Sequence, residues 1–282
     1  MIGGSMIQPP PVSPAPSLSG PAAPAPTVGL TWEFAALTDP GRVRPNNEDA
    51  VAFDPALGLA VLADGMGGYN GGEVASGMAI ALLQASFGRW LAHAGAGAPV
   101  RATRRAMQKC VDEANQAIYE ASAANEQLRG MGTTLVMAAF CGQRAVVGHI
   151  GDSRCYRLRG VRLEQLTRDH SLLQEQLSAG LITPEEAARS PHRNLVTRAL
   201  GIEKHVQVEL GEHDIQPGDL FLLCSDGLSE LLSCAEIHTI MSQNDSLREK
   251  ATLLVAAAND NGGWDNVSVL LAQAGVESVH SE

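Results

Sequence analysis

The fold is decided by one stretch of the sequence, Leu59-Ala-Val-Leu-Ala-Asp64-Gly65-Met66-Gly67-Gly68, in which an apolar run leads into an aspartate and several glycines. Runs of four to eight apolar residues bounded by turn residues are typical of buried strands. The same form recurs where residues 220–224 lead into Ser225-Asp226-Gly227 and where Asp265-Asn266 precedes the run 267–272. A single Asp-Gly pair after a strand is usually a turn. Carboxylates at several strand ends, with glycine allowing the backbone to approach closely, instead favour a site for hard divalent cations.

The composition limits the classes to which the chain can belong. With 282 residues, 45% of them hydrophobic and 4% aromatic, it can bury a large core built mainly of aliphatic and alanine side chains. The net charge of −11 argues against nucleic acid or an anionic membrane surface as the main partner, although metal ions at a site could still admit a phosphorylated substrate. The five cysteines form no Cys-x-x-Cys pair and no disulfide framework. No apolar segment reaches transmembrane length, so we expect a cytoplasmic protein without a membrane partner.

Residues 1–29 differ from the rest of the chain, because they are dominated by Pro, Ala, Ser and Gly and contain no charged residue. Such a composition cannot bury a core, so it predicts a disordered tail, which we interpret as a spacer rather than a tether for a partner. We expect one domain at residues 30–276 and a short C-terminal tail at 277–282.

Hydrophobic periodicity predicts ten strands, at 31–37, 50–53, 58–63, 131–141, 144–150, 153–158, 161–166, 207–210, 219–224 and 267–272. It also predicts long helices at 73–92, 100–125, 235–241 and 246–259 and short polar helices at 169–180 and 184–189. The turns Cys141-Gly142-Gln143 and Arg159-Gly160 suit an antiparallel meander of the four strands between residues 131 and 166. Strands followed by helices and again by strands predict an α+β layered sandwich rather than βαβ repetition.

Asp64, Asp226 and Asp265 lie far apart in the sequence, as residues that meet at one rim of a sandwich would. Asp152, in Gly151-Asp152-Ser153-Arg154, is a fourth candidate, with an ordinary hairpin turn as the alternative interpretation. Arg44-Pro-Asn-Asn-Glu48-Asp49 is a further group. It is either a surface ion pair of little energetic value or a phosphate site, since arginine can bind phosphate through two parallel hydrogen bonds.

Six motifs in order resemble those of the metal-dependent protein phosphatases of type 2C, and especially the bacterial members. They are Gly41-x-x-Arg44-x-x-Asn47-Glu48-Asp49, Ala63-Asp64-Gly65-Met66-Gly67-Gly68, Gly130-Met131-Gly132-Thr133-Thr134, Gly151-Asp152-Ser153-Arg154, Ser225-Asp226-Gly227-Leu228 and Asp265-Asn266-Val267. The resemblance covers about residues 31–275. It implies a four-layer α-β-β-α sandwich, with two antiparallel sheets flanked by helix pairs.

The resemblance also implies a role for each candidate residue. Asp64 would bridge two Mn²⁺ or Mg²⁺ ions, with the carbonyl of Gly65 on one of them and with Asp226 and Asp265 completing the other. Asp152, together with Asp226, would hold a third and weaker ion. Glu48 and Asp49 would hold waters on the metals, Arg44 would bind the substrate phosphate, and residues 169–194 would form a flap beside the site.

These roles predict a protein serine/threonine phosphatase that hydrolyses phosphoserine and phosphothreonine with a metal-activated water, opposes a cognate protein kinase and acts as a monomer. Two metals would supply the nucleophile and neutralise the phosphate dianion. The alternatives are a catalytically weak or inactive phosphatase-fold module that binds phosphoproteins, and an acidic cation-binding module.

The proton donor to the leaving oxygen is left open by the sequence. Many members of the resembled family have a histidine after the Asp-Gly pair, where this chain has Met66 and Tyr69. We interpret His149 as structural and expect His170 and His192 to be exposed without a role, so a metal-bound water is the preferred donor. Since this mechanism needs no Ser or Cys nucleophile, we interpret Cys224 and Ser225 as packing residues.

Overall fold

The computed structural model describes residues 30–68, 70–187, 190 and 195–276. The predicted tails at 1–29 and 277–282, together with Tyr69, His192 and part of the predicted flap, lie outside the described residues. No helix in the described part of the chain is long and apolar enough to cross a membrane.

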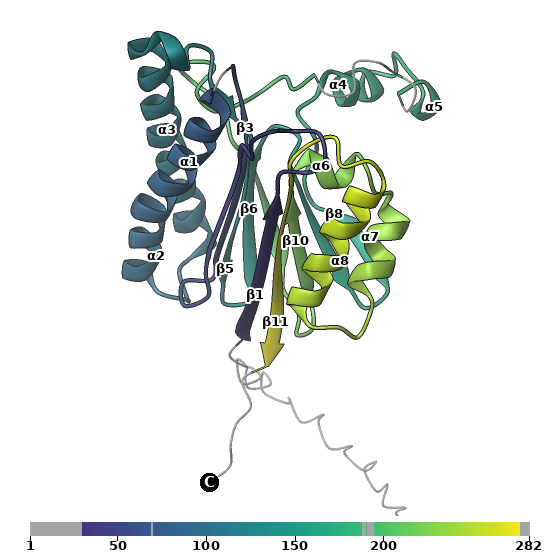
Figure 1. Ribbon diagram of the computed structural model, residues 1–282. Coiled ribbons are helices and arrows are strands. Elements are labelled where there is room, and N and C mark those ends of the chain that lie inside the picture. The colour runs from purple at the N-terminus through teal and green to yellow at the C-terminus, as the bar shows by residue number, and fades with distance from the viewer. Residues whose placement is uncertain (1–29, 69, 188–189, 191–194, 277–282) are drawn as a thin grey trace, which may run out of the picture.

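Two antiparallel sheets pack face to face in the centre of the molecule (Figure 1). One sheet has the order β1 (Leu30–Asp39), β11 (Val267–Val276), β10 (Leu220–Cys224), β7 (Arg154–Arg159) and β8 (Arg162–Gln165). The other has the order β2 (Asp49–Asp54), β3 (Leu59–Met66), β5 (Leu135–Cys141), β6 (Arg144–Ile150) and β9 (Glu209–Asp214), with the short β4 (Gly132–Thr133) beside β3. The predicted α+β sandwich is confirmed.

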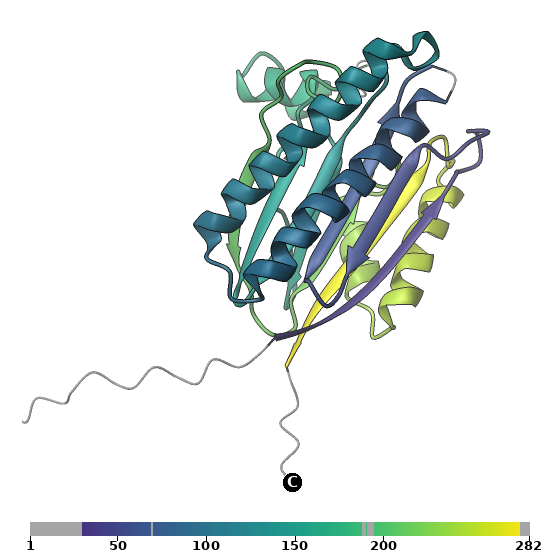
Figure 2. The ribbon, with the colours of Figure 1, turned by 90° about the vertical axis from the view of Figure 1, so that its left-hand side faces the viewer.

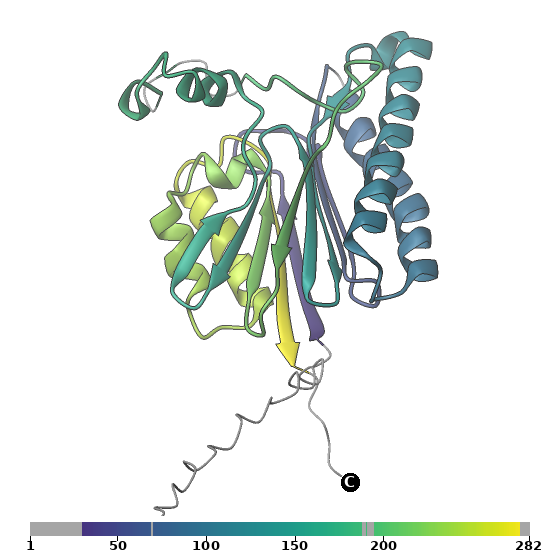
Figure 3. The same cartoon turned by 180° about the vertical axis from the view of Figure 1, so that it is seen from behind.

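Helices cover the outer face of each sheet (Figure 2). The β2–β9 sheet carries α1 (Gly71–Leu83), the π-helical turn η1 (Gln84–Gly88), α2 (Arg89–Ala94) and α3 (Val100–Ala124), which leads into η2 (Glu126–Leu128). The β1–β8 sheet carries α7 (Cys234–Met241) and α8 (Leu247–Asp260). Beyond the strand ends lie α4 (Leu172–Ser178), α5 (Pro184–Ala187) and the short α6 (Asp226–Ser229) (Figure 3). The predicted four layers are therefore present.

The helices form where local signals and burial agree. In α3, Thr103, Met107, Val111, Ala114 and Ile118 recur every three or four residues, and all are buried, so a single face of the helix packs on the sheet. α7 and α8 each begin with a Ser-x-x-Glu capping box, in which the serine side chain and the glutamate side chain satisfy each other's backbone N–H groups.

A cluster of aromatic side chains packs between the two sheets. Trp32 stacks on Phe140 with ring centroids 3.9 Å apart, and Phe140 packs on Phe221 at 5.0 Å. Sheet residues here are covered on one face by the other sheet and on the opposite face by helices. This double coverage explains why residues 59–63 form a continuous apolar run rather than an alternating one.

The predicted four-strand meander is wrong at its centre. β5 and β6 form a hairpin through Gly142, and β7 and β8 form another through Gly160, but β6 and β7 belong to different sheets. Residues 151–153 therefore cross from one sheet to the other instead of forming a hairpin turn. Gly151 has a φ of +100°, and a Cβ at this position would lie 2.7 Å from the Thr134 side chain, so glycine is required at the crossing.

Several elements also differ in extent from the prediction. The strand expected at 131–141 is interrupted at Thr134, whose N–H donates to the carbonyl of Asp64. The helix expected at 73–92 is divided by the π-helical turn η1. The strand expected at 207–210 begins at Glu209 and continues to Asp214, because it pairs with β6 over its whole length.

Candidate metal centre and phosphate site

Polar residues from both sheets converge on one cavity of about 240 Å³ at the end of the sandwich. Asp64 lies near the end of β3, Asp226 follows β10 as the first residue of α6, and Asp265 precedes β11. Asp152 reaches the cavity from the crossing between the sheets. Besides these four aspartates, the predicted site residues Arg44, Glu48 and Gly65 line the cavity. The structure thus brings together segments that are up to 221 residues apart in the sequence.

Asp64 is held in place by the threonines of the Gly-Met-Gly-Thr-Thr motif. Its N–H donates to Thr134 Oγ1 at 3.1 Å, and its carbonyl accepts from the Thr134 N–H at 2.8 Å and from Thr133 Oγ1 at 2.9 Å. Thr134 Oγ1 also lies 2.7 Å from Ser153 Oγ, beside Asp152. The motif therefore fixes two of the candidate ligands relative to each other.

Gly65 allows three segments to meet at the wall of the cavity. A Cβ at this position would lie 2.1 Å from the carbonyl oxygen of Gly72 and 2.6 Å from that of Glu48. The N–H of Gly65 donates to the same Glu48 carbonyl at 3.1 Å. Glycine is needed here for close backbone approach, and this approach sets Glu48 and the start of α1 against the strand that carries Asp64.

Arg44 extends over the rim of the cavity. Its guanidinium lies 2.8 Å from Asp265 Oδ2, and its side chain is 51% exposed. Asn266 anchors the loop that carries Arg44, because its Nδ2 donates to the carbonyls of Pro40 and Asn46. The Asn266 Oδ1 accepts from the Glu48 N–H at 2.8 Å. The guanidinium therefore forms an ion pair with a carboxylate that lines the cavity, rather than only with residues of its own loop. The charge of this carboxylate, Asp265, raises the pKa of Arg44.

Asp49 is buried beside the cavity and lies opposite Asp64 in the β2–β3 register. The Ser225 hydroxyl donates to Asp49 Oδ2 at 2.8 Å and accepts from the Ser268 N–H at 3.0 Å. The interpretation of Ser225 as a mere packing residue is therefore wrong, since it orients Asp49. Cys224 is fully buried in the apolar cluster beneath α7 and α8, as predicted for a packing residue.

The carboxylates of this group are poorly solvated and repel one another. Burial raises the pKa of Asp49 and of Asp152 to about 6. Burial, and next the neighbouring carboxylate charges, raise the pKa of Asp64 and Asp226 well above the usual range. Burial also raises the pKa of Glu48, although Arg44 opposes this effect.

This donor set suits divalent cations. Asp49 Oδ1 is buried and has no hydrogen-bond partner among the described residues. Among the described residues that line the cavity, Arg44 is the only cationic side chain facing five carboxylates. Oxygen ligands with an excess of negative charge are what Mg²⁺ and Mn²⁺ require, and bound cations would remove the repulsion that raises the carboxyl pKa values.

Two histidines stack on each other behind Gly151. The His149 and His170 ring centroids are 4.7 Å apart, and both side chains are buried, so the expectation of an exposed His170 is wrong. His170 Nδ1 accepts from the Gly151 N–H at 3.2 Å, which places the proton of the neutral ring on Nε2, 3.2 Å from Glu209. His149 Nε2 lies 2.7 Å from the Arg168 carbonyl.

The ligand atoms of His149, His170 and Glu209 lie within 4.8 Å of one another, as they would around a metal. The Nε2 proton of His170 nevertheless occupies the atom that would have to bind it. Burial lowers the pKa of both histidines, which keeps them neutral. The cluster therefore fastens the start of the 169–194 segment to β6 and β9, and it confirms the structural interpretation of His149.

Comparison with known proteins identifies relatives along most of the chain. The family described as Protein phosphatase 2C matches residues 42–264. The serine/threonine phosphatase stp of Listeria monocytogenes serotype 4b is 39% identical over 239 residues, which are 84% of this chain and 93% of that protein. The protein phosphatase PhpP of Streptococcus pneumoniae is 38% identical and covers 87% of this chain and 98% of its own.

Solved structures agree with these relatives. The serine/threonine phosphatase of S. agalactiae superposes with a TM-score of 0.80 at 36% identity, covering 87% of this chain and 100% of the other. The catalytic domain of the serine/threonine protein phosphatase PstP, solved in complex with two manganese ions, superposes with a TM-score of 0.77 at 38% identity. That match covers 87% of this chain and 99% of the PstP domain.

Proposed function

The chain belongs to the protein phosphatase 2C family and is a metal-dependent protein serine/threonine phosphatase, and from this premise we propose which of its residues perform the hydrolysis. The observation that carries the proposal is the convergence of Arg44 and five carboxylates on one small cavity. The poor solvation of those carboxylates supports a role that involves cations.

Asp64, Asp226 and Asp265, with the carbonyl of Gly65, would hold two Mn²⁺ or Mg²⁺ ions. Such ions lower the pKa of a water molecule and balance the charge of a phosphate dianion. The two manganese ions of the PstP domain support this number of ions. Asp152 would hold a third ion together with Asp226. With fewer protein ligands that ion would bind more weakly.

Arg44 would bind the phosphate of the substrate. Its guanidinium is half exposed and is restrained by Asp265 at 2.8 Å, so it can present two parallel N–H donors to phosphate oxygens with little loss of side-chain freedom. Glu48 and Asp49 would orient water molecules in the cavity, for which Asp49 Oδ1 has an unused acceptor. Ser225 keeps that oxygen in position by occupying the other one.

The substrates proposed are phosphorylated serine and threonine side chains of proteins that a cognate kinase has modified. The names of the relatives support this substrate class. All five cysteines are free thiols, which is compatible with the proposed action in the cytoplasm. A monomeric state stays a prediction of the sequence.

Release of phosphate from a phosphothreonine peptide tests the proposal. Protein freed of metal by a chelator should release none, and addition of Mn²⁺ should restore release in the wild type but not in Asp226→Asn, which keeps the shape of the side chain and removes its charge. A module that only binds phosphoproteins would retain the peptide, measured by fluorescence anisotropy, and release no phosphate at any Mn²⁺ concentration.

A separate measurement tests the third ion. Asp152→Ala should abolish the weakest step of a calorimetric Mn²⁺ titration and leave the two tighter steps in place. Three unchanged steps would contradict the assignment of Asp152, and loss of all three would show that Asp152 supports the whole centre.

A further inference from the structure

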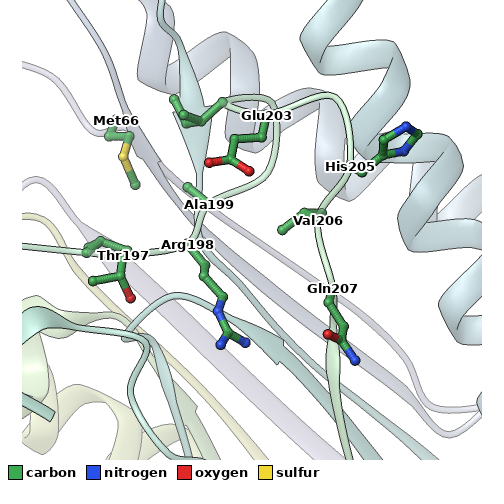
Figure 4. A pocket seen from close by; sticks show the side chains of 10 residues that line it. Met66, Thr197, Arg198, Ala199, Glu203, His205, Val206 and Gln207 are labelled. Atoms are coloured by element: carbon green, nitrogen blue, oxygen red, sulfur yellow. The ribbon is translucent and has the colours of Figure 1, made fainter. Parts of the chain in front are cut away.

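A second groove, of about 520 Å³, is shown in Figure 4, and it shares lining residues with the metal cavity. Its lining comes from Met66 and from the segment 196–207, which runs from the end of the flap region to the start of β9. Met66 and Val196 line both spaces, so the groove continues directly from the site where the phosphate would lie. A polypeptide whose phosphorylated side chain enters the cavity must cross one of its rims, and this rim already has a groove.

The walls of the groove are preformed. Leu200 and Thr133 exchange two backbone hydrogen bonds of 2.8 and 3.1 Å, which tie the segment to the motif that holds Asp64. Buried Asn115 donates to the carbonyls of Glu203 and Lys204 and accepts from the Gly201 N–H at 2.8 Å. A groove held this firmly imposes little ordering cost on a ligand that binds to it.

Arg198 contributes a positively charged side chain to the lining of this groove. Its side chain extends along the groove away from Glu203 (Figure 4), and it is exposed. Among the described residues it has no carboxylate within 4.0 Å, and its one neighbouring polar atom is His170 Nε2 at 3.5 Å. The other arginines around the site are paired, Arg44 with Asp265 and Arg154 with Asp169. Arg198 is therefore free to pair with a carboxylate supplied from outside.

We propose that this groove binds the substrate polypeptide beside its phosphorylated residue, and that Arg198 selects substrates with an aspartate or glutamate a few positions away. The inference rests on the proposed function of the adjoining cavity. Arg198 is two residues beyond Val196, and two residues span at most about 7 Å. The selected acidic residue therefore lies within about two to four positions of the phosphorylated one, on one side of it only.

The rest of the lining fits a peptide rather than a small molecule. Met66, Ala199 and Val206 provide apolar surface along the groove, while Glu203 lies at the end away from the Arg198 side chain. A carboxylate placed near Glu203 would be repelled. The opposite charges of Arg198 and Glu203 therefore favour one orientation of the bound peptide. The position at which an aspartate improves the substrate reveals that orientation.

The experiment uses phosphothreonine peptides of one neutral sequence, with a single aspartate moved through each position from about four before to about four after the phosphothreonine. The measure is the ratio of kcat/KM for each aspartate peptide to that for the neutral peptide. In the wild type this ratio should reach about ten at one or two adjacent positions, as expected for a hydrogen bond to a charged group. In Arg198→Ala it should fall to about one, and in Arg198→Glu below one.

Arg101→Glu is the matched control, since it makes the same change of charge at an exposed arginine. Arg101 lies in the first turn of α3. The loop before α3 contains Ala96 and Gly97 and lies near Gly142, at the end of the strands opposite to the metal cavity. This variant should keep the wild-type ratios. Far-ultraviolet circular dichroism verifies that each variant is folded.

The outcomes separate this inference from the function on which it rests. A wild type that hydrolyses all peptides without preference, or an Arg198→Ala variant that keeps the preference, would overturn the role of the groove alone. A wild type that releases no phosphate from any peptide with Mn²⁺ present would overturn the proposed function and this inference together.

Discussion

Removal of the Ser225 hydroxyl tests how the buried side of the metal centre is organised. This hydroxyl donates to Asp49 Oδ2 at 2.8 Å and accepts from the Ser268 N–H at 3.0 Å, and both of these groups are buried; its contact with the Asn266 carbonyl is longer, at 3.5 Å. In Ser225→Ala both partners lose a hydrogen bond without gaining access to water. Asp49 Oδ2 would then lose the hydrogen bond from Ser225, and Asp49 Oδ1 already has no partner among the described residues.

The expected cost follows from these two contacts. A buried hydrogen bond to a charged acceptor contributes about 1.5–3 kcal/mol, and leaving the Ser268 N–H unpaired adds about 1 kcal/mol. We therefore expect the free energy of unfolding to fall by about 2–4 kcal/mol. For a domain of this size that corresponds to a decrease in Tm of about 5–12 °C. Activity should also fall, because Asp49 loses the contact that orients it.

Urea and thermal denaturation monitored by circular dichroism provide the assay, and Ser229→Ala provides the control. Ser229 lies four residues away, and its buried hydroxyl has no hydrogen-bond partner among the described residues, so its removal should change the stability by less than about 0.5 kcal/mol. The reasoning is refuted if the two variants lose equal stability, or if Ser225→Ala loses none.

Three further outcomes follow from the site. Arg44→Ala should lower kcat/KM on a phosphopeptide by about ten- to hundredfold, because one charged contact to phosphate is lost; an unchanged kcat/KM would show that Arg44 does not touch the phosphate. Thiol alkylation should leave activity intact. Four of the five cysteines are buried, and the exposed one, Cys234, lies at the start of α7. Inactivation in step with labelling would contradict a mechanism without a cysteine nucleophile. Metal-free protein should gain thermal stability as the pH falls from about 7 to about 5. Asp49 and Asp152, whose pKa values are raised to about 6, and Asp64 and Asp226, whose pKa values are also raised, bind more protons in the folded state than in the unfolded state in this window. Asp226→Asn should show a smaller gain in the same scan, and equal gains would argue that other groups cause the effect.

The convergence of the main aspartates could be predicted from the sequence. Asp64 and Asp226 follow apolar runs and Asp265 precedes one, so each had to lie at a strand end. In a sandwich of two sheets such ends gather at a few rims, and glycine neighbours indicated close backbone approach. The path that leads to Asp152 could not be predicted in this way. Two apolar runs joined by a glycine-containing turn can be neighbouring strands of one sheet or strands of two different sheets. The sequence of the turn is similar in both cases.

The residues that position the site left a weaker signal. Ser225 reaches Asp49 across 176 positions, Thr134 reaches Asp64 across 70, and Asn266 reaches the loop of Arg44 across about 220. All three residues lie within sequence motifs of the site, but the residues to which they bind depend on how the two sheets stack. His170 was misjudged for the same reason, since its polar neighbours along the chain conceal its packing against His149.

The central claim is that the carboxylate cavity is a metal centre on which phosphatase activity depends. Bound Mn²⁺ and phosphate release from a phosphothreonine peptide, measured on the same samples of wild type and Asp64→Asn during Mn²⁺ titration, test it most directly. Wild-type activity should appear as at least two ions bind, and Asp64→Asn should bind fewer ions and lose activity by about a thousandfold or more. Near-normal turnover by Asp64→Asn, or full wild-type turnover with no Mn²⁺ or Mg²⁺ bound, would contradict the account.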